Sequence, residues 1–179
     1  MTRQVLLIRG VNVGTKNSLP MADLRAMLVE LGCARVRTYL QSGNAVFDTK
    51  LRTAVLAPRV EALLERAMGR PIRTVLRTPA ALRRVVEQNP FRDLETDPKH
   101  LCVTFFAGPP DPTELAPLTG RDWSPERFHV AGAELYTHHP GGQGRSPLAA
   151  ALAKLGPRSG ATTRNWNTVT NLLALAEED

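Results

Sequence analysis

The apolar residues of the chain fall into short runs and helical repeats that are separated by glycine, proline and polar loops. Residues 4–9 form a short apolar run that ends at Gly10, which is typical of a buried strand. Pro20 suits the first position of a helix, whose apolar residues recur at helical spacing as Met21, Leu24, Leu28 and Leu31. The pattern therefore predicts a strand and a helix, joined by a loop over residues 10–19.

The next segments predict a hairpin, a second helix and a fourth strand. Strands at 35–40 and 45–49 flank a Ser-Gly-Asn turn. A two-residue turn at Gly43-Asn44 would pair Leu40 with Phe47 and turn Tyr39 to the opposite face. A helix over about 56–67 precedes a strand at 72–77. This β-α-β-β-α-β order predicts the ferredoxin-like arrangement, in which two helices cover one face of a four-stranded antiparallel sheet.

The second half predicts a mixture of helices and strands. Helices are expected from Pro79, Asp111 and Ser146, and strands at 101–107, 127–130 and 134–138. A last helix is expected from about Thr163, and no internal sequence repeat is visible. We therefore predict an α+β protein, in which a ferredoxin-like βαββαβ lobe (1–78) packs on a smaller α+β lobe (79–179) that ends in a polar-capped helix.

Composition narrows the class of protein. The chain has 179 residues, enough for one domain or two small lobes with a packed core. No signal peptide or membrane-spanning run is visible, and Cys33 and Cys102 are expected to be reduced core residues. These features predict a cytoplasmic protein without a membrane partner. The net charge of +6 is concentrated in the first ninety residues, which allows steering of nucleic acid or phosphorylated ligands, although solvated arginines also explain it.

Four segments are richer in Gly, Asn, Ser, Thr and Arg than their structural roles require. They are Arg9–Asn17 (RGVNVGTKN), Gln41–Asn44 (QSGN), His139–Pro147 (HPGGQGRSP) and Thr162–Thr168 (TTRNWNT). The first and third can present backbone amides to an anion, although the first lacks the spacing of a nucleotide P-loop. The fourth would place polar donors in the first turn of a helix. Ordinary loop, turn and capping chemistry is the alternative for each segment.

These four segments contain few residues that could catalyse a reaction or bind a metal ion. The four segments contain no carboxylate and no cysteine, and Ser42 has no histidine or lysine beside it in the sequence. His138 and His139 are adjacent on an expected strand, so they point to opposite faces and cannot chelate one metal. Glu134, Tyr136 and His138 are expected to form an exposed stripe. We therefore predict no metal and no cofactor, and the catalytic residues stay unknown.

Five separated segments, in the same order, resemble one family of bacterial proteins. They are RGVNVGTKN, TYLQSGNAVF, NPF at 89–91, GxGRS at 142–146 and TTRNWNT. The sequence resembles domain-of-unknown-function family 1697 over nearly its whole length. The resemblance implies a small cytosolic α+β protein with a ferredoxin-like N-terminal part, and it implies no activity. Thr15 departs from the glycine usual after Gly14, and Gly141-Gly142 replace the usual polar-Gly pair.

Binding of an anionic small molecule, carrying phosphate or carboxylate, is the function that these observations favour. The alternatives are a small metal-free enzyme that uses Lys16 or Tyr39, a weak non-specific nucleic-acid-binding module, and an interaction module. The oligomeric state is left open. The residues expected to bind the ligand, on one connected surface, are Arg9, Asn12, Lys16, Asn17, Ser42, Asn44, Arg145, Ser146, Thr163, Arg164, Asn165 and Asn167.

Overall fold

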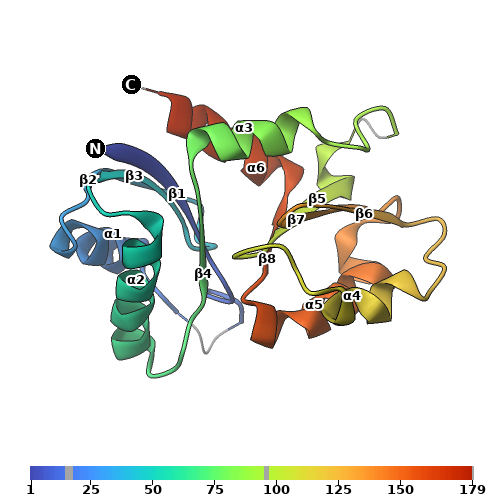
Figure 1. The fold of residues 1–179 in the computed structure, drawn as a ribbon, viewed down its shortest axis with the longest axis horizontal. Helices are drawn as coiled ribbons and strands as arrows, with labels where there is room; N and C mark the ends of the chain where they lie inside the picture. Colours follow the sequence, from blue (N-terminus) through green and yellow to red (C-terminus); the bar gives the residue numbers. More distant parts are fainter. Residues whose placement is uncertain (15–17, 95–96, 179) are drawn as a thin grey trace. The chain divides into compact units, whose positions relative to one another are not determined.

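The computed structural model describes residues 1–14, 18–94 and 97–178, which fold as two compact units. Unit 1 comprises Met1–Arg83 together with the C-terminal segment from Asn171, and unit 2 comprises Arg84–Thr170. Each unit contains one four-stranded antiparallel sheet (Figure 1). The mixed α+β class is therefore confirmed, whereas the lobe boundary at residue 78 stays a prediction.

Unit 1 follows the predicted β-α-β-β-α-β order. Its elements are β1 (Thr2–Ile8), α1 (Met21–Glu30), β2 (Ala34–Tyr39), β3 (Asn44–Thr49), α2 (Thr53–Met68) and β4 (Thr74–Arg77). The next helix, α3 (Pro79–Glu87), begins in unit 1 and ends in unit 2. The strands lie in the order β2-β3-β1-β4, and all neighbours are antiparallel. The predicted antiparallel sheet in this part of the chain is confirmed.

Helices α1 and α2 cover one face of this sheet. Leu24 and Leu28 of α1 share a buried cluster with Leu56 of α2 and with Ile8 and Phe47 of the sheet. The strand residues of this cluster are every second residue, Leu6 and Ile8 in β1 and Ala45 and Phe47 in β3, because successive side chains of a strand point to opposite faces. Burial of these large side chains drives the packing of both helices on the same face.

The hairpin register differs from the one predicted. Tyr39 pairs with Asn44 and Arg37 with Val46, so the connection spans residues 40–43 and Leu40 has no partner in β3. The prediction of a two-residue turn is therefore wrong. Because Asn44 is itself the first residue of β3, the turn needs the longer connection. Phe47 is fully buried beneath the helices, so it cannot stack on a base.

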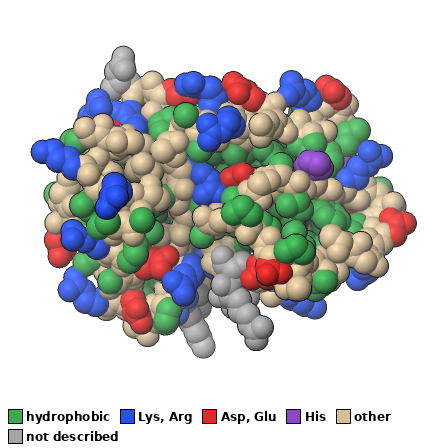
Figure 2. All heavy atoms as spheres, in the orientation of Figure 1, with side chains coloured by type: hydrophobic (Ala, Val, Ile, Leu, Met, Phe, Trp, Pro, Cys, Tyr) green, Lys and Arg blue, Asp and Glu red, His purple; other side chains and the backbone are tan. Residues whose placement is uncertain are grey.

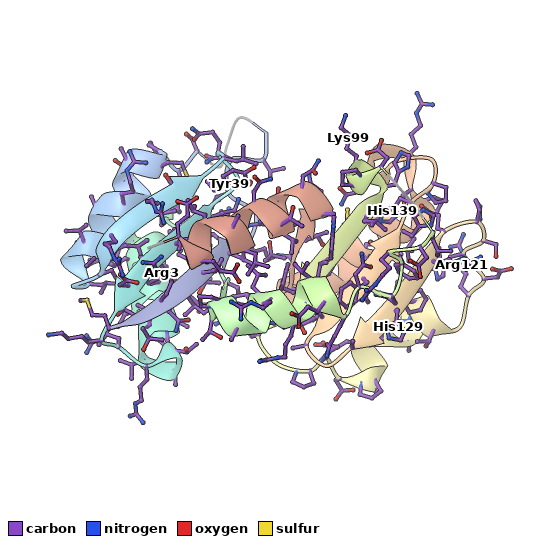
Figure 3. The ribbon with its side chains drawn as sticks, turned by 90° about the horizontal axis from the view of Figure 1, so that it is seen from above. Arg3, Tyr39, Lys99, Arg121, His129 and His139 are labelled. Carbon is purple, nitrogen blue, oxygen red and sulfur yellow. The ribbon has the colours of Figure 1, made fainter. Side chains whose placement is uncertain are left out.

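The C-terminal segment of the chain contacts the sheet of unit 1. Helix α6 (Trp166–Glu177) ends beside β1 and β2, where Arg3 donates to the Ala176 carbonyl and Arg37 to the Leu175 carbonyl (Figure 3). Arg3 also pairs with the Asp48 carboxylate at 2.8 Å. These contacts attach the last turns of α6 to the sheet of unit 1.

Unit 2 has the same connectivity as unit 1. Its elements are β5 (Leu101–Phe105), α4 (Pro112–Thr119), β6 (Arg127–Ala131), β7 (Glu134–His138), α5 (Pro147–Ser159) and β8 (Thr162–Asn165), with short 3-10 turns at Pro98–His100 and Gln143–Arg145. The strand order is β6-β7-β5-β8, which matches β2-β3-β1-β4 position by position. The two units thus repeat one topology, although the sequence shows no repeat.

Helices α4 and α5 cover one face of the second sheet. Leu118 of α4, Leu148 and Leu152 of α5 and Leu135 of β7 form one buried cluster with Phe106. A shared topology without sequence similarity is possible because a fold depends on the periodicity of apolar positions, and different side chains can satisfy the same periodicity.

Two predictions about unit 2 are wrong. Thr163 does not begin a helix, because Thr162–Asn165 form β8 and α6 begins at Trp166. Threonine favours strands, and pairing with β5 satisfies the backbone of this segment. The stripe that includes Tyr136 and His138 is not exposed, since Tyr136 is 2% and His138 is 7% accessible.

The surface mixes both signs of charge. On the face shown in Figure 2, Lys and Arg side chains are scattered among Asp and Glu side chains. Among the helices of the described residues, we find none with the length and apolar character needed to cross a bilayer.

Candidate functional site

The loop that follows β1 has an alternating backbone. Gly10, Asn12 and Gly14 have φ angles of 62°, 55° and 68°, whereas Val11 and Val13 between them have negative φ. Where right- and left-handed helical residues alternate, successive N–H groups turn toward a common side and form a concave anion-binding nest. The sequence segment RGVNVG therefore has the backbone character expected of an anion site.

Asn12 fixes this loop in place. Its carboxamide nitrogen donates to the carbonyls of Leu19 and Gln41, and its oxygen accepts from the Leu19 N–H at 2.7 Å. These bonds close the loop on itself and join it to the QSGN turn. Asn12 therefore holds the loop geometry, and its carboxamide is engaged within the protein.

The QSGN turn packs directly on the same loop. The Gly43 carbonyl accepts from the Ile8 N–H at 2.8 Å. A Cβ atom at Gly43 would lie 2.5 Å from Cγ2 of Val11, so only glycine permits this approach. Asn44, which is fully buried, donates to the Tyr39 carbonyl at 3.0 Å and to Ser42 Oγ at 2.8 Å. The structure thus brings the first two of the four predicted segments together.

Gly10, Val13 and Gly14 of this loop are exposed, whereas Val11 is buried. Within the described ranges, no N–H group from Gly10 to Gly14 donates a hydrogen bond to a protein acceptor. Arg70 Nη2 donates to the Gly10 carbonyl at 3.0 Å, which brings a guanidinium to the rim. Arg9 is half-buried, and this burial lowers the pKa of its guanidinium. Lys16 and Asn17, which were also predicted to bind the ligand, lie outside the described residues.

The third segment surrounds the N-terminus of α5. Ser146 caps this helix, since its Oγ accepts from the Ala149 N–H at 2.8 Å. Glu126 Oε2 accepts from the Leu148 N–H at 3.0 Å, so a carboxylate of the protein occupies the end of the helix. Burial opposes ionisation of Glu126, but hydrogen bonds from Ser146, Leu148 and His139 outweigh it and lower the pKa of the carboxyl. The helix dipole favours the same charge.

Ser146, His139 and Glu126 contain the residue types of a catalytic triad but not its geometry. Ser146 Oγ lies 2.8 Å and Glu126 Oε1 3.1 Å from the same ring nitrogen, Nδ1 of His139. A triad needs the serine and the acid on opposite nitrogens, and here Nε2 contacts Thr137 Oγ1 at 2.8 Å. Burial lowers the pKa of His139, which is 1% accessible (Figure 3). The cluster is structural and anchors α5 to the sheet.

The fourth segment forms β8 and the start of α6. Arg164 is 8% accessible, and its Nη1 donates to Thr162 Oγ1 at 2.7 Å and to the Thr163 carbonyl at 2.9 Å. Burial lowers the pKa of Arg164 to about 10. Asn165 Oδ1 accepts from the Thr168 N–H at 2.9 Å and so caps α6.

Three further predicted residues differ in accessibility. Arg145 and Asn167 are exposed, whereas Thr163 is half-buried and shares a hydrogen bond of 2.7 Å with Thr104. The common surface that we predicted for all four segments stays a prediction.

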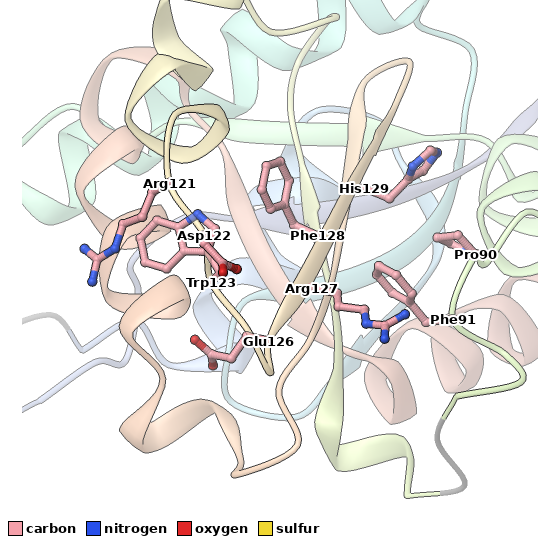
Figure 4. A pocket seen from close by; sticks show the side chains of 9 residues that line it. All are labelled: Pro90, Phe91, Arg121, Asp122, Trp123, Glu126, Arg127, Phe128 and His129. Carbon is pink, nitrogen blue, oxygen red and sulfur yellow. The ribbon is translucent and has the colours of Figure 1, made fainter.

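A pocket of unit 2 was not anticipated from the sequence. It has a volume of about 320 Å³ and lies at the outer edge of β6 (Figure 4). Its lining is aromatic and cationic, with two acids, and comprises Pro90, Phe91, Arg121, Asp122, Trp123, Glu126, Arg127, Phe128 and His129. The NPF motif at 89–91 was the available signal, since it lies in a loop without an evident capping role.

The positions of potential ligand side chains bear on metal binding. Among the residues that the structure describes, no group of three or more His, Cys, Asp and Glu side chains could hold a metal ion.

Comparison with known proteins places the chain in a family. Residues 1–136 match the family model described as "Protein of unknown function (DUF1697)". No curated protein matches the chain. The structure of the conserved bacterial protein SP0830 from Streptococcus pneumoniae is similar, with a TM-score of 0.82 and 23% identity over 98% of this chain and 99% of that one. At this identity the likeness concerns the fold. Since the family model spans most of the sequence, the chain belongs to the DUF1697 family.

Proposed function

We propose that the protein binds a small anionic ligand, carrying phosphate or carboxylate, in the nest formed by the loop after β1. The observation that carries this proposal is the run of backbone N–H groups from Gly10 to Gly14, whose φ angles alternate in sign and whose hydrogens have no protein acceptor within the described chain. Converging amides stabilise an anion without a dedicated side chain.

Neighbouring side chains add positive charge and fix the geometry. Arg70 brings a guanidinium group to the loop, and a guanidinium forms charge-assisted hydrogen bonds with phosphate or carboxylate. The participation of the other predicted ligand residues of the four segments stays a prediction. We class the fold of each unit as ferredoxin-like on the basis of its strand order.

Nuclear magnetic resonance on ¹⁵N-labelled protein tests the proposal directly. Titration with inorganic phosphate, acetate and adenosine monophosphate should shift the amide resonances of Gly10 and Gly14. The thermal midpoint should rise in parallel, because a ligand at a hundredfold excess over Kd stabilises the native state by about 2.7 kcal/mol. Shifts confined to other loops, or no shift at any concentration of the three probes, would show that the nest does not bind anions.

Two matched variants distinguish the loss of a positive charge at the loop from the loss of a positive charge elsewhere on the surface. Arg70→Gln should weaken phosphate binding by roughly threefold to tenfold, since one charge-assisted contact is lost. Arg66→Gln is the control, because this exposed arginine of α2 pairs with Glu30 at 3.8 Å and lies outside the loop. Equal affinities of the two variants would refute the role of Arg70.

Nucleic-acid binding is the weaker alternative. The basic N-terminal half attracts phosphate, but Phe47 is buried and the charges of the face in Figure 2 are mixed. A sheet that reads RNA stacks bases on exposed aromatic residues. We therefore expect any oligonucleotide binding to be independent of sequence and to disappear at physiological salt, because phosphate contacts release counterions.

A further inference from the structure

Two exposed apolar side chains lie in the loops that form and support the proposed nest. Val13 belongs to the loop after β1, and Leu40 belongs to the connection between β2 and β3. Val13 is 68% and Leu40 is 55% accessible, whereas Val11, in the same loop as Val13, is 2% accessible and packs in the core of unit 1. The chain therefore keeps two large apolar groups in water beside a polar backbone site, although contact of apolar surface with water is unfavourable.

Hydrogen bonds hold these two loops together. The carboxamide of Asn12, the residue before Val13, donates to the carbonyl of Gln41, the residue after Leu40. The backbone of Gly43 in the second loop also packs closely on the first loop. Val13 and Leu40 are therefore covalent neighbours of two residues that are in direct contact.

Leu40 also has an unfavourable backbone conformation. Its φ of 56° lies in the left-handed region, which glycine and asparagine tolerate and which strains a larger side chain. Turn positions of this kind favour Gly, Asn or Asp. An exposed leucine here is a poor choice for stability and for solubility. Strained residues of this kind cluster at ligand-binding sites, so the Leu40 side chain has the character of a ligand contact.

The other exposed large apolar side chains of the described residues lie in other segments. They are Met1 at the N-terminus, Val29 on α1 and Leu94 after α3. Single exposed apolar residues are common on protein surfaces and need no explanation. Val13 and Leu40 differ, because adjoining loops carry them and one ligand can contact both.

The same loop supplies the opposite chemistry. Arg70 Nη2 donates to the Gly10 carbonyl at 3.0 Å, which holds a cation at the loop that contains Val13. Backbone N–H groups and a guanidinium suit an anionic group, whereas aliphatic side chains suit an apolar one. A ligand that uses both kinds of contact joins an anionic group to an apolar group.

From this juxtaposition, we infer that the ligand is an amphiphilic anion, in which a phosphate or carboxylate is joined to a short apolar chain. The anionic group binds the N–H groups of the nest, and the apolar chain lies against Val13 and Leu40. The inference rests on the proposed function and adds the second part of the ligand. A free amphiphile fits better than a membrane surface, because two aliphatic side chains bury too little apolar area for stable attachment to a bilayer.

Two phosphate monoesters with the same head group test the inference. Hexyl phosphate, below the concentration at which it forms micelles, should bind about tenfold more tightly than methyl phosphate, which corresponds to burial of roughly two CH₂ groups. The methyl resonances of Val13 and Leu40 should shift with hexyl phosphate only, whereas the amides of Gly10 and Gly14 should shift with both esters. Equal affinities, with shifts at Gly10 and Gly14, would overturn the inference and leave the anion nest standing. No shift at Gly10 or Gly14 with either ester would refute the nest, and the inference with it.

Variants of the protein separate ligand contact from packing. Leu40→Asn relieves the strained backbone, so it should not lower the thermal midpoint, and it should bring the affinities for the two esters within about threefold of each other. Val13→Thr replaces one methyl group by a hydroxyl and should also reduce the preference for hexyl phosphate. Val29→Gln is the control, since it removes an exposed apolar side chain of α1 and should keep the tenfold preference. A tenfold preference in both loop variants, or a large loss of stability in Leu40→Asn, would refute the contact.

Vesicles distinguish the two sources of an amphiphilic phosphate. We expect no sedimentation of the protein with vesicles of phosphatidylcholine and phosphatidylglycerol, because the ligand is a free molecule. Sedimentation with these vesicles that Leu40→Asn abolishes, without binding of monomeric hexyl phosphate, would assign the two loops to a membrane surface and overturn the inference.

Discussion

Substitution of Gly43 by alanine is the sharpest test of how the QSGN turn is packed. Gly43 has a φ of +74°, and an added Cβ atom would lie 2.5 Å from Cγ2 of Val11 and 2.9 Å from Cβ of Ile8. The left-handed backbone alone costs an alanine about 1–2 kcal/mol. The overlap forces neighbouring atoms to shift, which costs a further 1–3 kcal/mol or so. We therefore expect Gly43→Ala to lower the free energy of unfolding by about 2–5 kcal/mol.

Gly69→Ala is the matched control. Gly69 ends α2 with a φ of +68°, nearly the same backbone conformation, but an added Cβ atom there meets no atom within 4 Å. This variant should lose only the conformational part, about 1–2 kcal/mol. The difference between the two variants therefore measures the contact of the turn with the loop after β1.

Urea unfolding followed by far-UV circular dichroism measures both variants. Fluorescence of Trp123 and Trp166, which both lie in unit 2, gives a comparison signal from the unit that does not contain Gly43. Gly43→Ala should also reduce the phosphate-induced shifts of Gly10, because the turn supports the nest. Equal stabilities of Gly43→Ala and Gly69→Ala would refute the packing argument.

Three other outcomes follow from buried groups. Asp48→Asn should lower the free energy of unfolding by about 1.5–3 kcal/mol at neutral pH, because the Asp48 carboxylate accepts a charge-assisted hydrogen bond from Arg3. The same bond lowers the pKa of Asp48, so the loss of stability should become smaller in acid. Urea titrations at several pH values measure this dependence. His139 has a lowered pKa, so the unfolded chain binds its proton more readily and stability should fall as pH drops below about 6.5, a dependence that His139→Gln should reduce in thermal scans. Burial raises the pKa of Cys102 to about 12, so an aromatic disulfide reagent should label this thiol only under denaturing conditions; rapid labelling of native protein contradicts the burial.

The sequence by itself determined the type and order of most elements. Apolar alternation and helical spacing depend on neighbours within a few residues, so they are visible in the chain before it folds. Gly69 and Ser146 are examples, since a left-handed C-cap and an N-cap serine act within one turn of their helices. The antiparallel sheet of unit 1 followed from the same local signals.

Only the tertiary structure decided which hydrogen-bond partner each polar side chain has. Asn12 has the character of a ligand donor, yet its carboxamide binds Leu19 and Gln41. The glycine-rich loop before α5 has the composition of an open anion site, yet Glu126 supplies a carboxylate from 22 residues before Leu148. Such hydrogen-bond partners depend on how the whole chain folds, so they cannot be predicted from the spacing of residues along the sequence.

The same reason explains the elements that local pattern misassigned and the site that it missed. Thr162–Asn165 became a strand because β5 has an edge to be paired, and this tertiary demand outweighs the capping preference of Thr162 and Thr163, whereas Asn165 at the end of the strand caps α6. The pocket beside β6 collects Phe91 and Trp123 from separate loops. The local pattern fixes the elements, because propensity and periodicity act over one or two turns, whereas strand pairing and side-chain partners depend on which distant segments the folded core brings into contact.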